Sequence, residues 1–158
     1  MDFESIYGEY SPRIFRVCMG YVNDHEQARD LTQETFIAVW QGLPSFRGEA
    51  SPSTWIFRIA TNICLRALEK AKRAKTTELP FHLPVSHEEP KEEKLRFLYK
   101  CIAGLEETER IIISLVLEDL PQAEIADIVG MSHANIRVRI FRIKEKLSVK
   151  FKQYGAFE

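Results

Sequence analysis

The stretch that decides the fold of the second half of the chain is QAEIADIVGMSHANIRVRI, residues Gln122–Ile140. Its first residues give a short helix with an apolar face, in which Ala126 is small where a second helix must cross closely. Gly130 supplies the backbone freedom for a turn, Ser132 can cap the next helix, and Ile136 can pack back against the first. This layout predicts a helix-turn-helix, a motif that indicates a way of binding DNA without naming a function.

The helix after this turn has an apolar stripe and a basic face. At about 100° per residue, the stripe that must pack inward consists of Ile136, Ile140, Ile143 and Leu147. The opposite face and its flank carry Ala134, Arg137, Val138, Phe141, Arg142 and Glu145. Apolar side chains on such a face suit the major groove, where they meet thymine methyls while arginine reads guanine. Alone, the pattern also fits a solvated basic helix with two incidental apolar residues.

Charge is distributed unevenly along the chain, although the formal net charge is only −1. Residues 132–152 contain seven basic residues and one acidic residue, whereas residues 1–69 contain six basic and nine acidic ones. A local excess of this kind indicates a polyanionic partner for the second half.

Composition narrows the class of protein further. Apolar residues make up 45% of the chain and charged residues 28%, as in soluble globular proteins. No apolar run approaches the length of a membrane span, and the start MDFESIYGEY lacks the layout of a signal peptide, so we expect a cytoplasmic protein. The cysteines Cys18, Cys64 and Cys101 lie far apart, which argues against a disulfide framework and a zinc site. We expect no metal and no cofactor.

Helical periodicity dominates the whole chain, and the predicted fold is all-α. Three helices are expected in a first domain, residues 1–74: one within 3–22, bent or restarted at Pro12, one over 24–41 and one from about 51 to 73. Residues 75–93 contain three prolines among mixed polar residues, which predicts a flexible linker. A second domain, residues 94–158, is expected to hold a helix starting near 92, then helices at 107–118, 121–129 and 132–150.

Two predicted outer faces of helices in the first domain carry residues that core packing does not explain. The helix from Asp24 presents an acidic and amide face that consists of Glu26, Asp30, Gln33, Glu34, Ile37 and Gln41. This face is either solvated or a docking surface for a protein; catalysis by its carboxylates is improbable. The third helix presents Trp55, Arg58, Asn62, Leu65 and Arg66, a combination that suits single-stranded nucleic acid, where bases stack and phosphates need cations. The loop SFRGEASPS at its head could take in an unstacked base.

Two segments resemble a known family. ARDLTQETFIAVWQGLPSFRGEASPSTWIFRIATN is similar to the second conserved region of bacterial extracytoplasmic-function (ECF) RNA polymerase sigma factors, and LPQAEIADIVGMSHANIRVRIFRIKEKL is similar to their fourth. The resemblance implies two helical DNA-binding domains joined by a flexible linker. It implies binding to the clamp helices of the largest polymerase subunit and to the flap region, recognition of two promoter elements, melting of the downstream one, and commonly an anti-sigma factor.

The resemblance also assigns roles to residues. It implies polymerase binding by Asp30, Gln33, Glu34, Ile37 and Trp40. It implies downstream-element and single-strand contacts by Phe46, Arg47, Trp55, Arg58, Ile59, Ala60, Asn62 and Arg66. It implies upstream-element contacts by Ala134, Arg137, Val138, Arg139, Phe141 and Arg142. The chain has Ala134-Asn135-Ile136 where the family usually has Gly-Thr-Val, and Val138 where a small or polar residue is common, so the promoter sequence stays open.

The sequence therefore predicts an ECF-type sigma factor that is not an enzyme. The main alternative is a two-domain helix-turn-helix regulator that binds duplex DNA without melting it, which would leave the face around Asp30 and the stripe around Asn62 without a purpose. An enzyme acting on nucleic acid is improbable because no metal cluster or activated nucleophile is recognisable. An anti-sigma or adaptor protein is a weaker alternative, since no zinc-type set of cysteine and histidine supports it.

Overall fold

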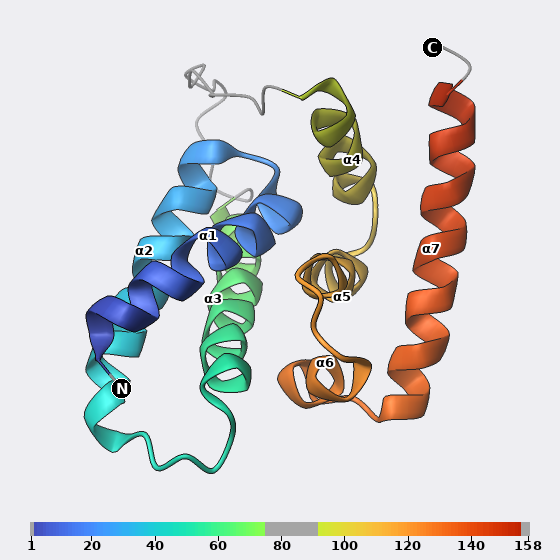
Figure 1. The fold of residues 1–158 in the computed structure, drawn as a ribbon. Coiled ribbons are helices and arrows are strands. Elements are labelled where there is room, and N and C mark those ends of the chain that lie inside the picture. The colour runs from blue at the N-terminus through green and yellow to red at the C-terminus, as the bar shows by residue number, and fades with distance from the viewer. Residues whose placement is uncertain (1, 75–91, 156–158) are drawn as a thin grey trace.

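The computed structural model describes residues 2–74 and 92–155, which form helices grouped into two domains (Figure 1). The first domain consists of α1 Phe3–Val22, α2 His25–Gly42, the short 3₁₀ helix η1 Leu43–Ser45 and α3 Pro52–Ala74. The second consists of α4 Glu93–Ala103, α5 Glu107–Leu117, α6 Gln122–Val129 and α7 His133–Gly155. The predicted all-α fold with two helical domains is confirmed. Residues 75–91 of the expected linker lie outside the described residues.

The helices of the first domain begin where the capping signals predict. Asp24 Oδ1 accepts a hydrogen bond from the Gln27 N–H at 3.1 Å, and Ser51 Oγ accepts one from the Thr54 N–H at 3.1 Å. The expected restart at Pro12 does not occur, because α1 runs through this residue without a break. The proline side chain is exposed there, away from the packed side of the helix.

The core of the first domain lies where α1 crosses α2 and α3. Ile14, Val17, Ile56 and Phe57 are fully buried in it. Burying a side chain of this size stabilises a fold by about 1.5–3 kcal/mol. The apolar residues of α1 and α3 recur at helical spacing and face the core. The outer faces of α2 and α3 are not needed for this packing and stay available for other contacts.

The second domain contains the predicted helix-turn-helix, formed by α6 and α7. Gly130 ends α6 with φ = +74°, a left-handed conformation that residues other than glycine rarely adopt, and its N–H donates to the Ala126 carbonyl at 2.9 Å. Ser132 Oγ accepts from the Asn135 N–H at 3.1 Å and caps α7. The α7 stripe of Ile136, Ile140, Ile143 and Leu147 is buried.

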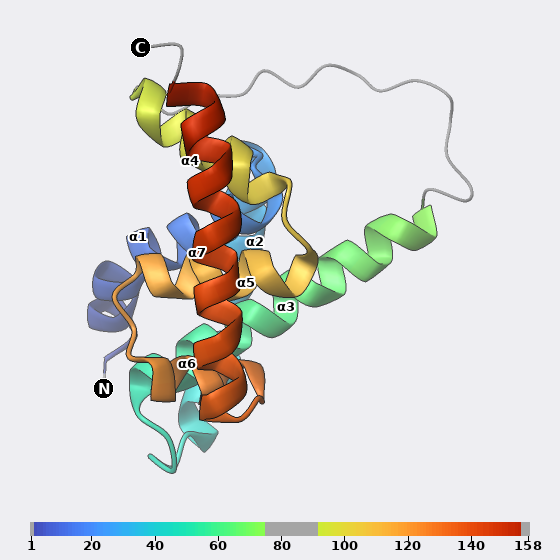
Figure 2. The same cartoon turned by 90° about the vertical axis from the view of Figure 1, so that its right-hand side faces the viewer.

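The two domains pack directly against each other. Helix α1 contacts α4 and α5, and α3 contacts α6 (Figures 1 and 2). Helix α7 packs on α4, α5 and α6 at the side of the molecule opposite α2 (Figure 1). The outer face of α2 and the outer face of α7 therefore point away from the junction of the two domains.

Candidate polymerase and nucleic-acid interfaces

The outer face of α2 gathers the residues predicted to bind polymerase. Asp30, Gln33 and Glu34 are exposed, and Ile37 and Trp40 keep 58% and 61% of their surface in solvent. Their spacing of three or four residues puts them on one side of the helix. Two large apolar side chains left exposed beside carboxylates are typical of a surface that another protein covers.

Helix α1 adds two aromatic residues to this face that the sequence analysis missed. Phe3 packs edge-on against Trp40, with ring centroids 5.1 Å apart, and Tyr7 packs edge-on against Phe36 at 5.0 Å. Tyr7 remains 47% exposed. The signal in the sequence is the spacing of four residues between Phe3 and Tyr7, which puts both rings on one side of α1. There they extend the apolar surface of α2.

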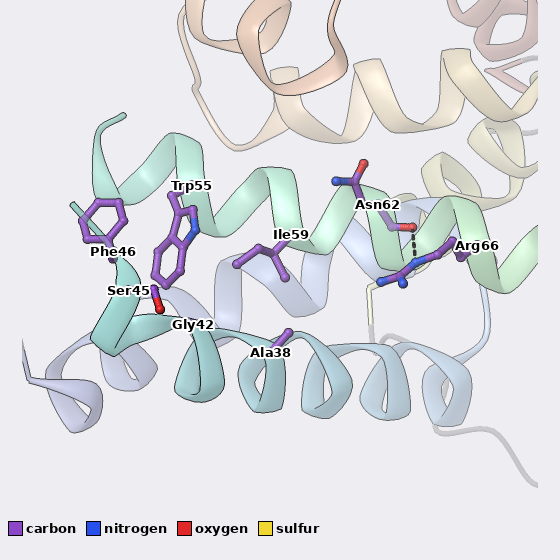
Figure 3. A pocket seen from close by; sticks show the side chains of 8 residues that line it. All are labelled: Ala38, Gly42, Ser45, Phe46, Trp55, Ile59, Asn62 and Arg66. Carbon is purple, nitrogen blue, oxygen red and sulfur yellow. Dashed lines mark hydrogen bonds between the residues drawn. The ribbon is translucent and has the colours of Figure 1, made fainter. Parts of the chain in front are cut away.

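A pocket of about 380 Å³ lies between α2 and α3 (Figure 3). It is lined by Ala38, Gly42, Ser45, Phe46, Trp55, Ile59, Asn62 and Arg66. Phe46 and Trp55 stack at one end, with ring centroids 4.5 Å apart and an angle of 26° between the planes. Asn62 and Arg66 lie at the other end, where the Arg66 Nε donates to the Asn62 main-chain carbonyl at 3.4 Å. Stacked aromatic rings, an amide and a cation in one cavity suit an unstacked base with its phosphate.

Three residues predicted for the downstream element lie outside this pocket. Ala60 is fully buried on the inward side of α3, so it shapes the pocket only through helix packing. Arg47 is exposed in the loop before α3. Arg58 turns toward the second domain, where its Nη2 donates to the Asp127 carbonyl at 3.2 Å. Spacing along a helix cannot show this contact, because its partner is 69 residues away in the chain.

Helix α2 contributes pocket residues that the sequence analysis did not single out, and Gly42 has a clear physical role among them. A Cβ at this position would lie 3.0 Å from Cζ2 of Trp55. The absence of a side chain therefore lets the indole lie close over the end of α2 and form the wall beside Phe46. The signal in the sequence is a glycine directly after the helix predicted over 24–41, followed by a tryptophan near the start of the next predicted helix.

The outer face of α7 presents most of the residues predicted for the upstream element. Ala134, Arg137 and Arg142 are exposed, and Val138 and Phe141 keep 46% and 63% of their surface in solvent. The mixture of arginine with exposed apolar side chains matches what the edges of bases offer in a major groove.

Arg139 differs from its neighbours on α7. It is half-buried, and its Nε donates to Asn135 Oδ1 at 3.2 Å. Lys146, on a later turn of α7, forms an ion pair with Glu109 of α5 at 2.7 Å. Burial of the Glu109 carboxyl acts to raise its pKa, but the bonds from Lys146 and from the Glu106 N–H outweigh burial and lower it. The ion pair between Lys146 and Glu109 joins α7 to α5, whereas the bond of Arg139 lies within α7.

Among residues 2–74 and 92–155, no group of three or more His, Cys, Asp or Glu side chains is arranged to hold a metal ion. Cys18, Cys64 and Cys101 are buried free thiols. The part of the chain that the structure describes has no helix of the length and apolar character needed to cross a membrane.

Family models match both domains of the chain. Residues 6–74 match the Sigma-70 region 2 family and residues 96–147 match the Sigma-70, region 4 family. The first match contains α2, the pocket and all of α3, and the second contains α6 and the first part of α7. The exposed residues of α2, the pocket and the outer-face residues 134–142 of α7 thus all lie inside matched segments.

Relatives and solved structures match along nearly the full chain. The RNA polymerase sigma-H factor of Pseudomonas aeruginosa is 27% identical over 92% of this chain and 83% of its own length. The ECF RNA polymerase sigma-E factor of Haemophilus influenzae is 28% identical over 94% of this chain and 86% of its own. The sigma factor RpoE from Bartonella quintana, solved with the anti-sigma factor NepR, shares the fold, with a TM-score of 0.82, 21% identity and coverage of 96% and 97% of the two chains. With both sigma regions present in order, the chain belongs to the ECF sigma factors of bacterial RNA polymerase.

Proposed function

We propose that this sigma factor uses the three surfaces described above for three tasks: one binds polymerase and two recognise promoter elements. The α2 face binds the clamp helices of core polymerase, the outer face of α7 reads the upstream element, and the pocket between α2 and α3 takes in a base of the downstream element. The observation that carries the proposal is the pocket, because stacked aromatic rings beside Asn62 and Arg66 suit an extruded base. A regulator that binds only duplex DNA has no use for it.

The protein is expected to contribute binding energy and strand separation, with RNA synthesis left to the polymerase. It then acts in the cytoplasm as a transcription initiation factor and not as an enzyme. RpoE is solved with the anti-sigma factor NepR. CnrH, a second solved structure with a similar fold (TM-score 0.71, 21% identity), is solved with the cytosolic domain of CnrY. An anti-sigma factor is therefore proposed as a partner of this chain too.

Arg137→Ala and Arg142→Ala should each weaken binding of the holoenzyme to a cognate promoter. Both side chains are exposed on the outer face of α7, and loss of a residue that reads a base costs about 1–3 kcal/mol. The measurement is a titration of labelled duplex promoter at one fixed salt concentration. Lys94→Ala, which removes the same charge from the exposed start of α4, is the matched control. Equal affinities for wild type and both α7 variants would contradict the assignment.

Asp30→Arg should reduce binding to core polymerase while leaving the fold intact. The change puts a cation in the middle of the acidic α2 face, where the docking surface of the polymerase must be complementary. A pull-down of core polymerase measures the loss, and circular dichroism checks the fold. Glu9→Arg makes the same charge change on an exposed residue of α1 outside this face, and should bind as wild type does. Unchanged capture by the Asp30 variant would remove the α2 face from the interface.

Co-purification separates the proposal from its main alternative. A sigma factor recovers core polymerase from a mixture and directs transcript starts to defined promoters. A duplex-binding regulator recovers DNA without polymerase, and its binding does not depend on Asp30 or Asn62.

A further inference from the structure

Two cysteine side chains meet in the core of the first domain. Cys18 lies on α1 and Cys64 on α3, and their sulfur atoms are 3.8 Å apart although the residues are 46 positions apart in the chain. Both thiols are free and fully buried. At this distance the S–H of one thiol donates a hydrogen bond to the sulfur of the other. The fold therefore brings into direct contact two thiols that their wide spacing in the sequence did not connect.

The separation of the two sulfur atoms is close to what a disulfide needs. Bonded sulfur atoms are about 2.05 Å apart, so these two must approach each other by about 1.8 Å. The thiols face each other across the junction of two helices, and a bond between them would join α1 directly to α3. Disulfides in intracellular proteins are usually reversible and respond to oxidants.

The contact makes the two thiols unequal in acidity. The hydrogen bond from Cys64 lowers the pKa of the Cys18 thiol, although burial acts to raise it. The same hydrogen bond, together with burial, raises the pKa of the Cys64 thiol. Cys18 is therefore the first of the two to lose its proton, and the thiolate is the form of cysteine that oxidants attack.

We propose that Cys18 and Cys64 are a modification site, at which a hydroperoxide forms a disulfide that joins α1 to α3. The Cys18 thiolate attacks one oxygen of hydrogen peroxide, the O–O bond breaks, and a sulfenic acid forms while hydroxide leaves with the proton that Cys18 gave up, as water. The Cys64 sulfur then attacks the Cys18 sulfur, the S–O bond breaks, and the departing hydroxide takes the Cys64 proton as a second water. The two thiols lose two electrons, and the peroxide gains them.

Burial decides when this reaction takes place. Neither sulfur is accessible in the packed domain, so peroxide reaches Cys18 when α1 and α3 separate locally. The bond then closes a loop of chain that contains all of α2 and the pocket residues from Ala38 to Asn62. A cross-link of this kind stabilises a fold by restricting the unfolded chain. The modification thus holds the first domain closed after an episode of opening under oxidising conditions, independently of DNA and polymerase.

Peptide mapping of the full chain tests for the bond directly. The chain is treated with hydrogen peroxide, remaining thiols are blocked, and trypsin is added without reductant. The digest should contain residues 17–29 joined to residues 59–66, the tryptic peptides that carry Cys18 and Cys64. Dithiothreitol should separate the two peptides. A wild-type chain that gives only unmodified thiols, or sulfinic acid without the cross-link, would overturn the inference.

Cys101 provides the matched control. It is a third buried free thiol, and it lies on α4 in the other domain. Cys101→Ala should therefore leave the yield of the cross-linked peptides unchanged, whereas Cys64→Ala should abolish them and leave Cys18 at the sulfenic acid or beyond. Circular dichroism checks that both variants are folded. Loss of the cross-link in the Cys101 variant would instead assign the reaction to a different pair of thiols.

Denaturation measurements separate the formation of the bond from its effect. Guanidinium below the unfolding midpoint should increase the rate of cross-linking, because it increases the local separation of α1 and α3. The cross-linked chain should have an equilibrium constant for unfolding that is lower by about 30-fold or more. A rate that does not respond to guanidinium would contradict the control by burial. A cross-linked chain that unfolds as readily as the reduced chain would contradict the stabilising role.

Discussion

Asn62→Ala should give a holoenzyme that assembles and binds the upstream element normally but forms open complexes poorly on duplex promoters. Asn62 lines one end of the pocket between α2 and α3, opposite the end at which Phe46 and Trp55 stack, and its side chain is exposed. An amide there can hydrogen-bond the edge of an extruded base. Extrusion costs a few kcal/mol of stacking and pairing, and loss of the edge contacts leaves more of that cost without compensation.

The substitution should not disturb the fold. Asn62 lies in the middle of α3, and alanine is a better helix former than asparagine. Its main-chain carbonyl, which accepts from Arg66, is retained in the variant. Any loss of activity therefore reports on the missing amide.

Permanganate reactivity of unpaired thymines measures the melting directly. A template already mismatched across the start region should restore much of the activity of the Asn62 variant, because its strands are separated in advance. Glu69→Ala, on the exposed side of the same helix outside the main pocket, serves as the control. Wild-type opening of duplex promoters by Asn62→Ala would instead favour a regulator that never melts DNA.

Ile143→Ala should have the largest effect on stability. Ile143 is fully buried on the inward stripe of α7, and cutting a buried isoleucine to alanine costs about 2–5 kcal/mol through lost burial and the cavity left behind. Chemical denaturation followed by circular dichroism measures the change in the free energy of unfolding.

Phe141→Ala is the matched substitution on the opposite face. Phe141 keeps 63% of its surface in solvent, so its loss should leave the free energy of unfolding nearly unchanged while it weakens promoter binding. The pair thus separates the packing stripe of α7 from its DNA-facing side. Comparable destabilisation by both variants would show that the outer face of α7 contributes to the core.

Local signals were enough to predict the helices and the faces that they present. Asp24 and Ser51 cap the helices that follow them, and Gly130 makes the turn of the helix-turn-helix, because each of these effects is confined to a few neighbouring residues. The α2 face was predicted correctly as an exposed surface, since its residues recur at the period of one helix. Its role as the polymerase surface stays a prediction.

Contacts between distant segments could not be predicted in the same way. The partners Arg16 and Glu118 are 102 residues apart, and nothing in either local pattern identifies the other. Arg58 shares the helical face of Asn62, yet it bonds to α6 because the packing of the domains decides its partner. Gly20 is an unremarkable position in a helical pattern until α5 is placed against it.

The exposure of the α2 face has a consequence for the order of events during assembly. Asp30, Ile37 and Trp40 are accessible while the two domains are still packed together. If the α2 face binds polymerase as proposed, we expect polymerase to capture the chain in its packed form and the domains to separate in a second, unimolecular step. The rate of first encounter should then be insensitive to the strength of the Arg16–Glu118 ion pair, which joins α1 to the end of α5. The strength of this pair should appear in the lifetime of the complex, because a chain that recloses before its second domain finds a site on polymerase dissociates early.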